Sequence, residues 1–474
     1  MLLKYFYDDK LAQASYLIGC QAAGEAIVID PARNIKDYAK TAKANGVKIV
    51  GVTETHIHAD FLSGTRELAS RFGATLYLSD EGGMNWKYRY APGYDHVFLK
   101  DGDTFDIGNL TFEVLHTPGH TPEHISLLVT EGRLSENKPI GIFTGDFVFV
   151  GDVGRPDLLE KLAGVHDSSE EMTLKMFRSL QRFKQLPDYL QVWPGHGAGS
   201  ACGKTLGAVP STTVGYEKLT NWALQYDTEE HFVEAMLTGQ PEAPTYFSMM
   251  KRLNKDGTQL IDEIEAPNSM KASLDTVETW MKQGVVVDTR PVKKFAEKHL
   301  RGVMNIPYNK LFVNWAGWLL DYDRPIYLLA SEKYVEDILN DLRSIGLDQV
   351  IATMDPNVTD QADEGDKRLM NYKELTPAAA CDAIRTEQVY VLDVRYESEW
   401  NDGHIPEAKH IMLGYLPGRV QEISRDKPIL VYCKTGRRSA VAASILHANG
   451  FEDVRNLIGG YDEWVKTGDH IPTS

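Results

Sequence analysis

Short hydrophobic runs, several alternating with polar residues, recur through the N-terminal half of the chain. Such runs predict β-strands, whereas apolar positions spaced three or four residues apart predict amphipathic helices. The expected strands cover residues 2–7, 14–19, 26–30, 47–52, 74–78, 97–99, 111–116, 125–129, 140–143 and 190–193. The expected helices cover residues 35–45, 63–72, 158–164, 169–184, 216–226 and 229–237. This order predicts layered sheets covered by helices.

The C-terminal half contains an internal repeat. An Asp-x-Arg motif at 288–290 returns at 393–395, an offset of 105 residues, and each copy follows a strand-like run. The apolar run at 325–330 returns at 428–433, an offset of 103. A helical pattern follows each run, so two similar α/β units are expected in tandem. The segment 355–371 between them is rich in Asp, Asn, Gln and Gly, which is typical of a linker.

We therefore expect an α/β multidomain protein, and a length of 474 residues predicts roughly three domains. The expected boundaries are a first domain over 1–265, a second over 266–355, a linker over 356–372 and a third over 373–474.

The composition argues against some classes of binding partner and indicates a location in the cell. A net charge of -17 argues against a nucleic-acid or anionic-membrane partner held by bulk charge. No apolar run has the length of a membrane-spanning helix, and the N-terminus lacks a signal-peptide pattern. Four cysteines in so long a chain form no disulfide framework. A cytoplasmic location is expected.

The candidate chemistry of the first domain lies at four strand ends. His56, His58 and Asp60 form an H-x-H-x-D turn after the run 47–52. Three later motifs also follow predicted strands; they carry His120 in T-P-G-H-T, Asp146 in T-G-D and His196 in P-G-H. Residues 56 and 58 face the same way in extended backbone. Histidine and carboxylate side chains gathered at strand ends predict a metal site.

These motifs resemble the metallo-β-lactamase fold, a four-layered αββα sandwich, over roughly residues 1–210. That fold usually builds two metal positions from H-x-H-x-D-H, but Phe61 stands here where the last His would be. A phenyl ring cannot ligate, so we expect one metal ion. Mononuclear iron on this fold marks the persulfide dioxygenases, and the resemblance implies Fe(II), one per chain, held by His56, His120 and Asp146. His58, Asp60 and His196 would then orient ligands or waters, or have only structural roles.

Two further residues of this domain are candidates. Arg155, in G-R-P-D, resembles a segment beside the iron and is expected to hold an anionic substrate, to pair with Asp157, or both. Cys202 lies in a Gly-rich loop after His196, where similar fusion proteins carry a cysteine, and suggests substrate exchange or sulfur relay. Lys204 is expected to lower the pKa of its thiol.

The third domain carries Cys433-Lys434-Thr435-Gly436-Arg437-Arg438 between a buried strand and a helix. Backbone N–H groups of such a loop, with the helix N-terminus behind them, form an anion cradle that favours a thiolate. The segment resembles the rhodanese family, whose cysteine carries a transferable sulfur as a persulfide. Its C-x4-R spacing is one residue shorter than the C-x5-R of related phosphatases. In the second domain Ala330 replaces the cysteine, which predicts an inactive rhodanese-like domain.

Together the domains resemble persulfide dioxygenase–rhodanese fusions: a metallo-β-lactamase sandwich followed by two rhodanese-like α/β domains. The resemblance implies a dioxygenase and sulfurtransferase that oxidises low-molecular-weight persulfides with dioxygen to sulfite, then converts sulfite to thiosulfate, in sulfide detoxification. It also implies a homo-oligomer, a dimer or tetramer. The alternatives are a zinc-dependent thioester hydrolase of the glyoxalase II type, a sulfur-trafficking carrier in which only Cys433 acts, and a phosphatase at Cys433.

Overall fold

The computed structural model describes residues 1–474 except 133–137, 159, 161–167, 364, 387 and 468–474. The chain forms two units. Unit 1 contains Met1–Ile264 and Arg343–Gly346, and unit 2 contains Glu265–Leu342 and Leu347–Ser474. The helix predicted at 158–164 falls largely outside the described residues.

The first sheet of unit 1 has six strands in chain order, β1 (Leu2–Asp8), β2 (Gln13–Cys20), β3 (Glu25–Ile29), β4 (Lys48–Thr53), β5 (Thr75–Ser79) and β6 (His96–Leu99). Pairs among β1–β3 are antiparallel and pairs among β3–β6 are parallel. The parallel strands need crossover connections, and α1 (Lys36–Ala44) and α2 (Thr65–Phe72) supply the first two.

The second sheet has the order β12-β11-β10-β9-β8-β7. Its strands are β7 (Thr104–Ile107), β8 (Leu110–His116), β9 (Ile125–Glu131), β10 (Gly141–Gly145), β11 (Gln191–Pro194) and β12 (Thr212–Thr213). The helices around and after it are α4 (Ser168–Phe183), α5 (Val214–Thr220), α6 (Glu229–Leu237) and α7 (Phe247–Asp256). The strands β7 and β12 and the helix α7 were not predicted.

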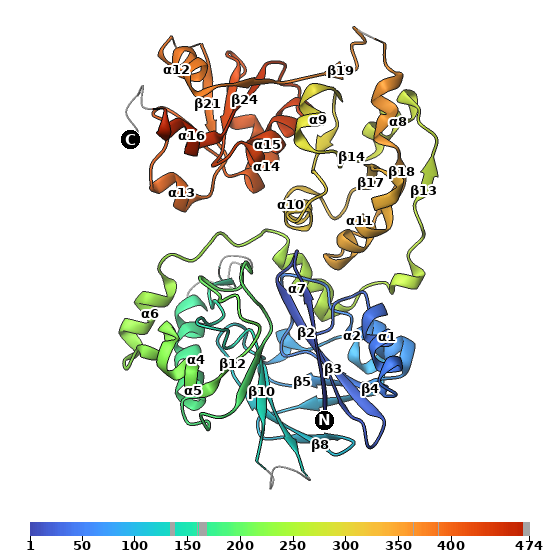
Figure 1. Cartoon of the computed structure of the whole chain (residues 1–474), viewed down its shortest axis with the longest axis vertical. Coiled ribbons are helices and arrows are strands. Elements are labelled where there is room, and N and C mark those ends of the chain that lie inside the picture. Colours follow the sequence, from blue (N-terminus) through green and yellow to red (C-terminus); the bar gives the residue numbers. More distant parts are fainter. Residues whose placement is uncertain (133–137, 159, 161–167, 364, 387, 468–474) are drawn as a thin grey trace. The chain divides into compact units, whose positions relative to one another are not determined.

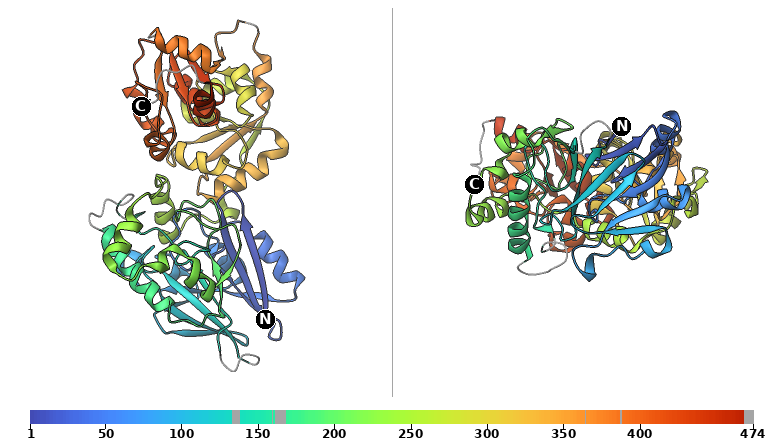
Figure 2. Two further views of the ribbon diagram at one scale, coloured as in Figure 1. Left: turned by 60° about the vertical axis from the view of Figure 1, so that its left-hand side comes forward. Right: turned by 90° about the horizontal axis from the view of Figure 1, so that it is seen from below.

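Alternating side chains divide the core of unit 1 into three layers. On β2, Leu17 packs toward α1 and α2, whereas Tyr16 and Ile18 pack between the two sheets. On β9, Leu127 faces the other sheet and Leu128 faces α4 and α6. Successive residues of a strand point to opposite faces, so both faces of each sheet are buried. The result is the predicted αββα sandwich, seen in Figures 1 and 2.

Unit 2 contains the two predicted α/β repeats. The first sheet has the order β13 (Asn268–Met270), β18 (Val350–Met354), β17 (Ile326–Leu329), β14 (Val285–Asp288) and β16 (Met304–Asn305). The second has the order β20 (Lys373–Leu375), β24 (Val454–Leu457), β23 (Ile429–Tyr432), β21 (Tyr390–Asp393) and β22 (Lys409–His410). All these pairs are parallel. The repeat is confirmed, because equivalent strands occupy equivalent positions.

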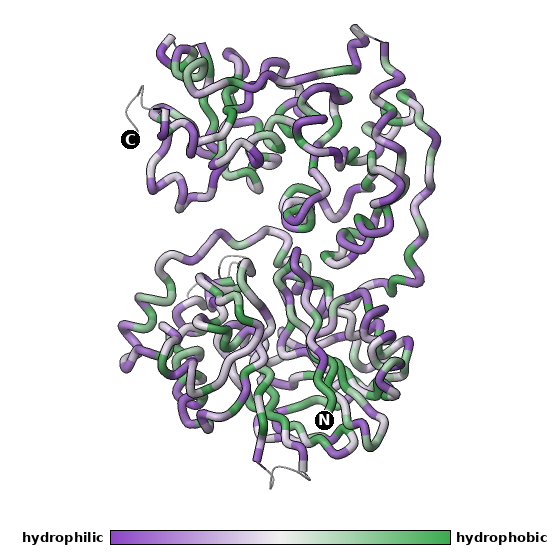
Figure 3. The backbone as a smooth tube through the Cα atoms, in the orientation of Figure 1, coloured by the Kyte–Doolittle hydropathy of each residue, from purple (hydrophilic) through white to green (hydrophobic). Residues whose placement is uncertain are grey.

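Helices connect these strands. The first repeat has α8 (Leu274–Gln283), α9 (Val292–Glu297), α10 (Phe312–Leu319) and α11 (Glu332–Ser344). The second has α12 (Pro377–Arg385), α13 (Glu397–Asn401), α14 (Leu416–Arg419), α15 (Arg437–Ala448) and α16 (Gly460–Lys466). Most residues of α11 are hydrophilic, with hydrophobic residues between them (Figure 3). Two of the hydrophobic residues, Ile338 and Leu342, are buried. By contrast α15 is buried along most of its length.

The segment predicted as a linker is folded against the first repeat. Its 3₁₀ helix η5 (Pro356–Gln361) is capped by Asp355, whose side chain accepts a hydrogen bond from the N–H of Asn357. Strand β19 (Leu369–Met370) then pairs antiparallel with β15 (His299–Leu300). No helix in the described part of the chain is both long and apolar enough to cross a membrane.

Candidate metal centre and cysteine loop

Asp30, at the end of β3, organises the turn that follows β4. Its Oδ1 accepts from the N–H of Thr55 at 2.7 Å, and its Oδ2 accepts from the Thr55 hydroxyl at 3.0 Å. Because that hydroxyl donates to Asp30, it accepts in turn from Nδ1–H of His56 at 3.0 Å. This assignment leaves Nε2 of His56 unprotonated, and that atom is buried with no hydrogen-bond partner in the described part of the chain.

His120 and His196 are oriented in the same way. Nδ1–H of His120 donates to the carbonyl of Arg155 at 2.9 Å, and Nδ1–H of His196 donates to the carbonyl of Ala12 at 3.0 Å. The Nε2 atom of each ring is buried, and no residue that the structure describes forms a hydrogen bond with it. Metal-binding histidines are commonly fixed through their other ring nitrogen in this manner.

Asp146, just after β10, lies among the three rings. Its Oδ2 is 3.8 Å from Nε2 of His56 and 3.5 Å from Nε2 of His120, while Oδ1 is 3.4 Å from Nε2 of His196. Burying unpaired polar atoms is costly unless something satisfies them. The donor atoms of His56, His120 and Asp146 lie within 4.8 Å of one another. Two imidazoles and one carboxylate therefore converge in a form that fits a metal ion.

Two glycines of the motifs permit this approach. Gly145 has φ of +47°, and a Cβ there would lie 2.2 Å from the Thr55 hydroxyl oxygen. A Cβ on Gly195 would lie 2.7 Å from Oδ1 of Asp146. Any larger residue would push the carboxylate or the turn away, which explains the glycines of T-G-D and P-G-H.

Burial sets the protonation of the rings. It lowers the pKa of His120 to about 3 and holds the pKa of His56 well below its usual value, so both rings are neutral and can act as ligands. For His58 the effect of burial is outweighed by Asp30, and its pKa rises to about 9. Nε2 of His58 lies 3.0 Å from Oδ1 of Asp30. His58 therefore pairs with Asp30, and its role around the metal stays a prediction.

A second group of donors lies on the other side of Asp146. It contains Asp60, His196 and Cys202, all buried, with one donor atom from each lying within 4.8 Å of the others. The prediction that Lys204 lowers the pKa of the Cys202 thiol is wrong. Burial, followed by the charges of Asp60 and Asp146, raises that pKa well above its usual value. The ammonium of Lys204 instead donates to the carbonyl of Ala235.

Arg155 is fully buried and forms the ion pair with Asp157 that was one of its two predicted roles. Its Nε and Nη2 donate to the two carboxylate oxygens of Asp157, each at 2.7 Å. A role in holding an anion stays a prediction, and the guanidinium would first have to leave Asp157.

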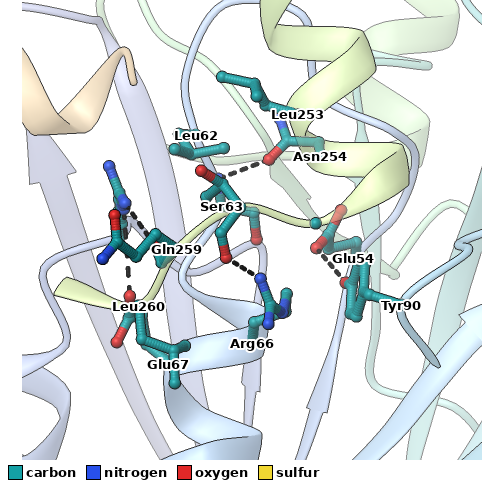
Figure 4. Close-up of a pocket in the computed structure, with 13 residues that line it drawn as sticks. Glu54, Leu62, Ser63, Arg66, Glu67, Tyr90, Leu253, Asn254, Gln259 and Leu260 are labelled. Carbon is teal, nitrogen blue, oxygen red and sulfur yellow. Dashed lines mark hydrogen bonds and ion pairs between the residues drawn. The ribbon is translucent and has the colours of Figure 1, made fainter. Parts of the chain in front are cut away.

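Helix α7 contributes two residues that the sequence analysis missed. Nδ2 of Asn254 donates to the carbonyls of His58 at 2.9 Å and Phe61 at 2.8 Å, and Oδ1 accepts from the N–H of Ser63 at 2.8 Å. Figure 4 shows Asn254 reaching from α7 to Ser63 beside a small cavity. Asn254 thus fixes the turn that carries the H-x-H-x-D motif.

The second missed residue is Lys251, one turn earlier on the helix. Its ammonium is buried without a hydrogen-bond partner among the described residues. Burial lowers its pKa to about 8, although Glu123 and Cys202 oppose this, and its charge lowers the pKa of His120. The spacing of the buried residues Phe247, Met250 and Asn254 indicates the helix, but no motif marks Lys251.

Cys433 follows β23 and lies at the floor of the loop that leads into α15. Its Sγ accepts from the N–H of Gly436 at 3.2 Å and from the hydroxyl of Ser439 at 3.4 Å. Gly436 has φ of +87°, a conformation that turns its N–H toward the sulfur at little cost only for glycine. The thiol is buried, with 1% exposure. The loop therefore presents hydrogen-bond donors and a helix N-terminus to a sulfur anion.

The cations of this loop differ in environment. Lys434, Thr435 and Arg437 are exposed. Arg438 is partly buried and makes a bidentate ion pair with Glu399, at 2.6 and 2.7 Å. Arg438 is thus held by Glu399 rather than directed only at the sulfur.

The first repeat keeps the frame without the thiol. Arg290 donates hydrogen bonds to the Asp288 carboxylate and to the carbonyl of Lys298. In the second repeat, Arg395 donates in the same way to the Asp393 carboxylate and to the carbonyl of Gly403. Ala330 follows β17 as Cys433 follows β23.

Comparison with known proteins shows which families this chain is similar to. The profile of the metallo-beta-lactamase superfamily matches residues 8–196, and that of the rhodanese-like domain matches residues 376–467. A solved metallo-β-lactamase structure from Staphylococcus aureus subsp. aureus COL is 41% identical, with a TM-score of 0.67; the match covers 75% of this chain and 98% of that one. The chain belongs to the metallo-β-lactamase superfamily. Thiosulfate sulfurtransferase GlpE of Coxiella burnetii is 32% identical over 105 residues, 22% of this chain and 95% of GlpE.

This metallo-β-lactamase superfamily member therefore also carries a rhodanese-like domain, and the two domains together indicate an enzyme. A hydroxyacylglutathione hydrolase of Crocosphaera subtropica is 31% identical over 175 residues. That match covers 36% of this chain and 59% of the relative.

Proposed function

We propose that this protein is a non-haem iron(II) persulfide dioxygenase joined to a rhodanese-type sulfurtransferase. The observation that supports it best is the buried set of His56, His120 and Asp146, two imidazoles and one carboxylate. Among the described residues, Nε2 of each ring has no hydrogen-bond partner. This is the ligand type of non-haem iron oxygenases. An iron(II) ion held there would supply activation of dioxygen. Overall, a persulfide, dioxygen and water would give thiol, hydrogen sulfite and one proton.

The surrounding residues would bind the substrate and keep water out. The ammonium of Lys251 has no hydrogen-bond partner among the described residues and lies 5.3 Å from the centre of the Trp86 ring. It would offer a positive charge to an anionic persulfide or to sulfite. Phe61 and Phe149 are buried, and their rings lie 4.3 Å from that of His58 and 6.0 Å from that of His196. These phenyl rings give the centre an apolar wall, which strengthens charge interactions inside it.

At the second site, Cys433 would carry sulfur. Its thiolate attacks the outer sulfur of a persulfide, the sulfur–sulfur bond breaks, and the departing thiolate takes a proton. The sulfur atom of sulfite then attacks the outer sulfur of the Cys433 persulfide, releasing thiosulfate and the Cys433 thiolate. The N–H of Gly436 and the hydroxyl of Ser439 stabilise that thiolate. Covalent capture divides one difficult transfer into two easier ones.

The test is oxygen uptake by iron-loaded protein given freshly prepared glutathione or coenzyme A persulfide, with sulfite and thiosulfate quantified. We expect uptake with thiosulfate as the main product. His120→Ala should lose iron and oxygen uptake while sulfur transfer at Cys433 survives. No uptake by protein with full iron occupancy and several persulfides would exclude the dioxygenase.

A zinc-dependent thioester hydrolase is the second candidate, favoured by the likeness to a hydroxyacylglutathione hydrolase. Hydrolysis of S-lactoylglutathione by the zinc-loaded protein, without oxygen uptake by the iron-loaded protein, would support it.

A further inference from the structure

We propose that Glu399 determines which sulfur donors react at Cys433. By holding Arg438, it favours donors whose reacting group carries at most one negative charge, such as low-molecular-weight persulfides, over the thiosulfate dianion. The inference rests on the sulfur transfer proposed above and names the donor class of that same site. Glu399 acts through Arg438 and is therefore a positioning residue.

Glu399 and Arg438 form a partly buried ion pair with two hydrogen bonds. Nη1 and Nη2 of Arg438 donate to Oε2 and Oε1 of Glu399 at 2.6 and 2.7 Å. The side chain of Arg438 is 15% exposed and that of Glu399 is 23% exposed. Although burial acts in the opposite direction, Arg438 lowers the pKa of Glu399, so the carboxylate is charged at neutral pH. Two parallel hydrogen bonds fix the orientation of the guanidinium.

Tyr396 holds both members of the pair in place. Oε2 of Glu399 also accepts from the N–H of Tyr396 at 3.1 Å, which closes the first turn of α13. The central guanidinium carbon of Arg438 lies 5.1 Å from the centre of the Tyr396 ring. A cation over an aromatic ring is attracted to its face. Arg438 is therefore held by a carboxylate and a ring, and does not turn freely toward the sulfur.

Arg438 also lies close enough to Cys433 to act on its charge. It is the second residue of α15, and the next residue, Ser439, donates to Sγ of Cys433 at 3.4 Å. Against the effect of burial, Glu399 and then Cys433 raise the pKa of Arg438. The guanidinium and the sulfur therefore interact electrostatically. A negative charge that neutralises Arg438 also weakens the positive potential at the sulfur.

The other cations of the loop are in a different environment. Lys434 and Arg437 are exposed, and in the described part of the chain no ion pair involves either of them. Water and salt screen exposed charges, so each contributes less at the sulfur than a partly buried guanidinium would. The local charge beside Cys433 thus depends strongly on whether Arg438 is neutralised.

The first repeat, which lacks the thiol, also lacks both members of the pair. Lys294 stands in place of Glu399 at the offset of 105 residues, and Val335 stands in place of Arg438 at the offset of 103. That repeat does keep the Asp-x-Arg pair at 288–290, which therefore belongs to the shared frame. Of the two repeats, the one with the thiol has the second ion pair, which indicates a role at the sulfur.

The charges of the donors give the expected preference. Thiosulfate brings two negative charges to the reacting sulfur, whereas a persulfide or an organic thiosulfonate brings at most one. The Cys433 thiolate attacks the outer sulfur, the bond to that sulfur breaks, and the leaving group departs with the electron pair. That group is sulfite from thiosulfate and a sulfinate from a thiosulfonate. A free Arg438 would favour the dianion most, and Glu399 removes this advantage.

The test compares thiosulfate with methanethiosulfonate, a monoanion, as sulfur donors to the full-length protein, with cyanide as acceptor and thiocyanate measured. Both donors leave the same Cys433 persulfide, so the cyanide step cancels in the ratio of their kcat/KM values. We expect Glu399→Gln to raise the ratio of thiosulfate to methanethiosulfonate by about tenfold, and added salt to reduce the gain. Glu399→Asp retains the charge and should keep the parent ratio.

Glu422→Gln is the matched control, because Glu422 makes a bidentate pair with Arg419 at 2.7 and 2.8 Å in the same domain. It should leave the ratio unchanged. Arg438→Gln should lower the ratio, which tests the inference even if Glu399→Gln does not fold. An unchanged ratio in the folded variants of the pair would overturn this inference alone. Absence of thiocyanate from both donors in the parent protein would overturn the sulfur transfer itself, and this inference with it.

Discussion

Nε2 of His299 accepts a hydrogen bond from Nδ1 of His447 at 3.0 Å, and this bond joins the two rhodanese-like repeats of unit 2. The direction follows because Nδ1–H of His299 is already donated to the carbonyl of Phe295 at 2.8 Å. Beside it, the N–H of Asn305 donates to the hydroxyl of Ser444 at 2.9 Å. The contact therefore requires the His299 ring to be neutral, because its Nε2 accepts, whereas His447 donates from Nδ1.

Acid should loosen this contact. Burial lowers the pKa of His299 to about 3. It also lowers the pKa of His447 to about 4; the charge of Arg301 acts in the same direction on His447, and those of Glu452 and Asp453 act against it. Below pH 6.5 the unfolded chain binds protons that the folded contact excludes, so the free energy of opening falls as pH falls. The slope is about 1 kcal/mol per histidine per pH unit between roughly pH 6.5 and 4.

Hydrogen exchange of the α15 amides between pH 5 and 7, corrected for intrinsic rates, measures this slope. His447→Asn keeps an N–H near the Nδ1 position but does not titrate, and it should flatten the dependence. Protection of α1 in unit 1 should not respond to the variant. An unchanged slope in α15 would show that the histidine pair does not set it.

Asn254→Ala should weaken unit 1 and the metal centre together. The change removes three hydrogen bonds to the turn and leaves the carbonyls of His58 and Phe61 without their partner. We expect a loss of about 3 kcal/mol in the free energy of unfolding and metal affinity reduced by about 10- to 100-fold. Ser248→Ala, exposed on the same helix, is the control for both urea denaturation and metal titration.

Lys251→Met should raise KM for an anionic persulfide by about tenfold or more, since about 1.4 kcal/mol of lost binding is a factor of ten. The effect on kcat should be smaller if the ammonium acts mainly in binding. Lys251→Arg should recover part of the affinity. Arg252→Met removes an exposed charge from the next position and should leave KM unchanged. Steady-state oxygen uptake measures all three, and equal effects of both Met variants would contradict a specific role for Lys251.

Cys433→Ser should reduce sulfur transfer from thiosulfate to cyanide to background, because the hydroxyl cannot form a persulfide. Oxygen uptake should continue, with sulfite replacing thiosulfate as the main product. Cys381→Ser changes a buried cysteine of α12 in the same domain and should retain transfer. Transfer that survives in Cys433→Ser would move the sulfur chemistry to another residue.

The local patterns of the sequence determined much of this protein by themselves. Alternating residues of single strands predict the layers, because strand geometry alone decides which face each side chain takes. His56, His120, Asp146 and Cys433 follow predicted strands, and motifs at strand ends mark them. The repeat at an offset of 105 residues likewise predicted two equivalent sheets.

Contacts between distant segments were decided only by the tertiary structure. Cys202 joins Asp60 across more than a hundred residues. From a helix that no motif marks, Asn254 bonds to the turn of the H-x-H-x-D motif, and the charge of Lys251 acts on His120. The raised pKa of the Cys202 thiol depends on burial beside two carboxylates, which its neighbour Lys204 in the sequence does not reveal. The pairing of His299 with His447 also arises only when the repeats pack. In each case the deciding energy comes from desolvation and packing, and these depend on which segments meet in space.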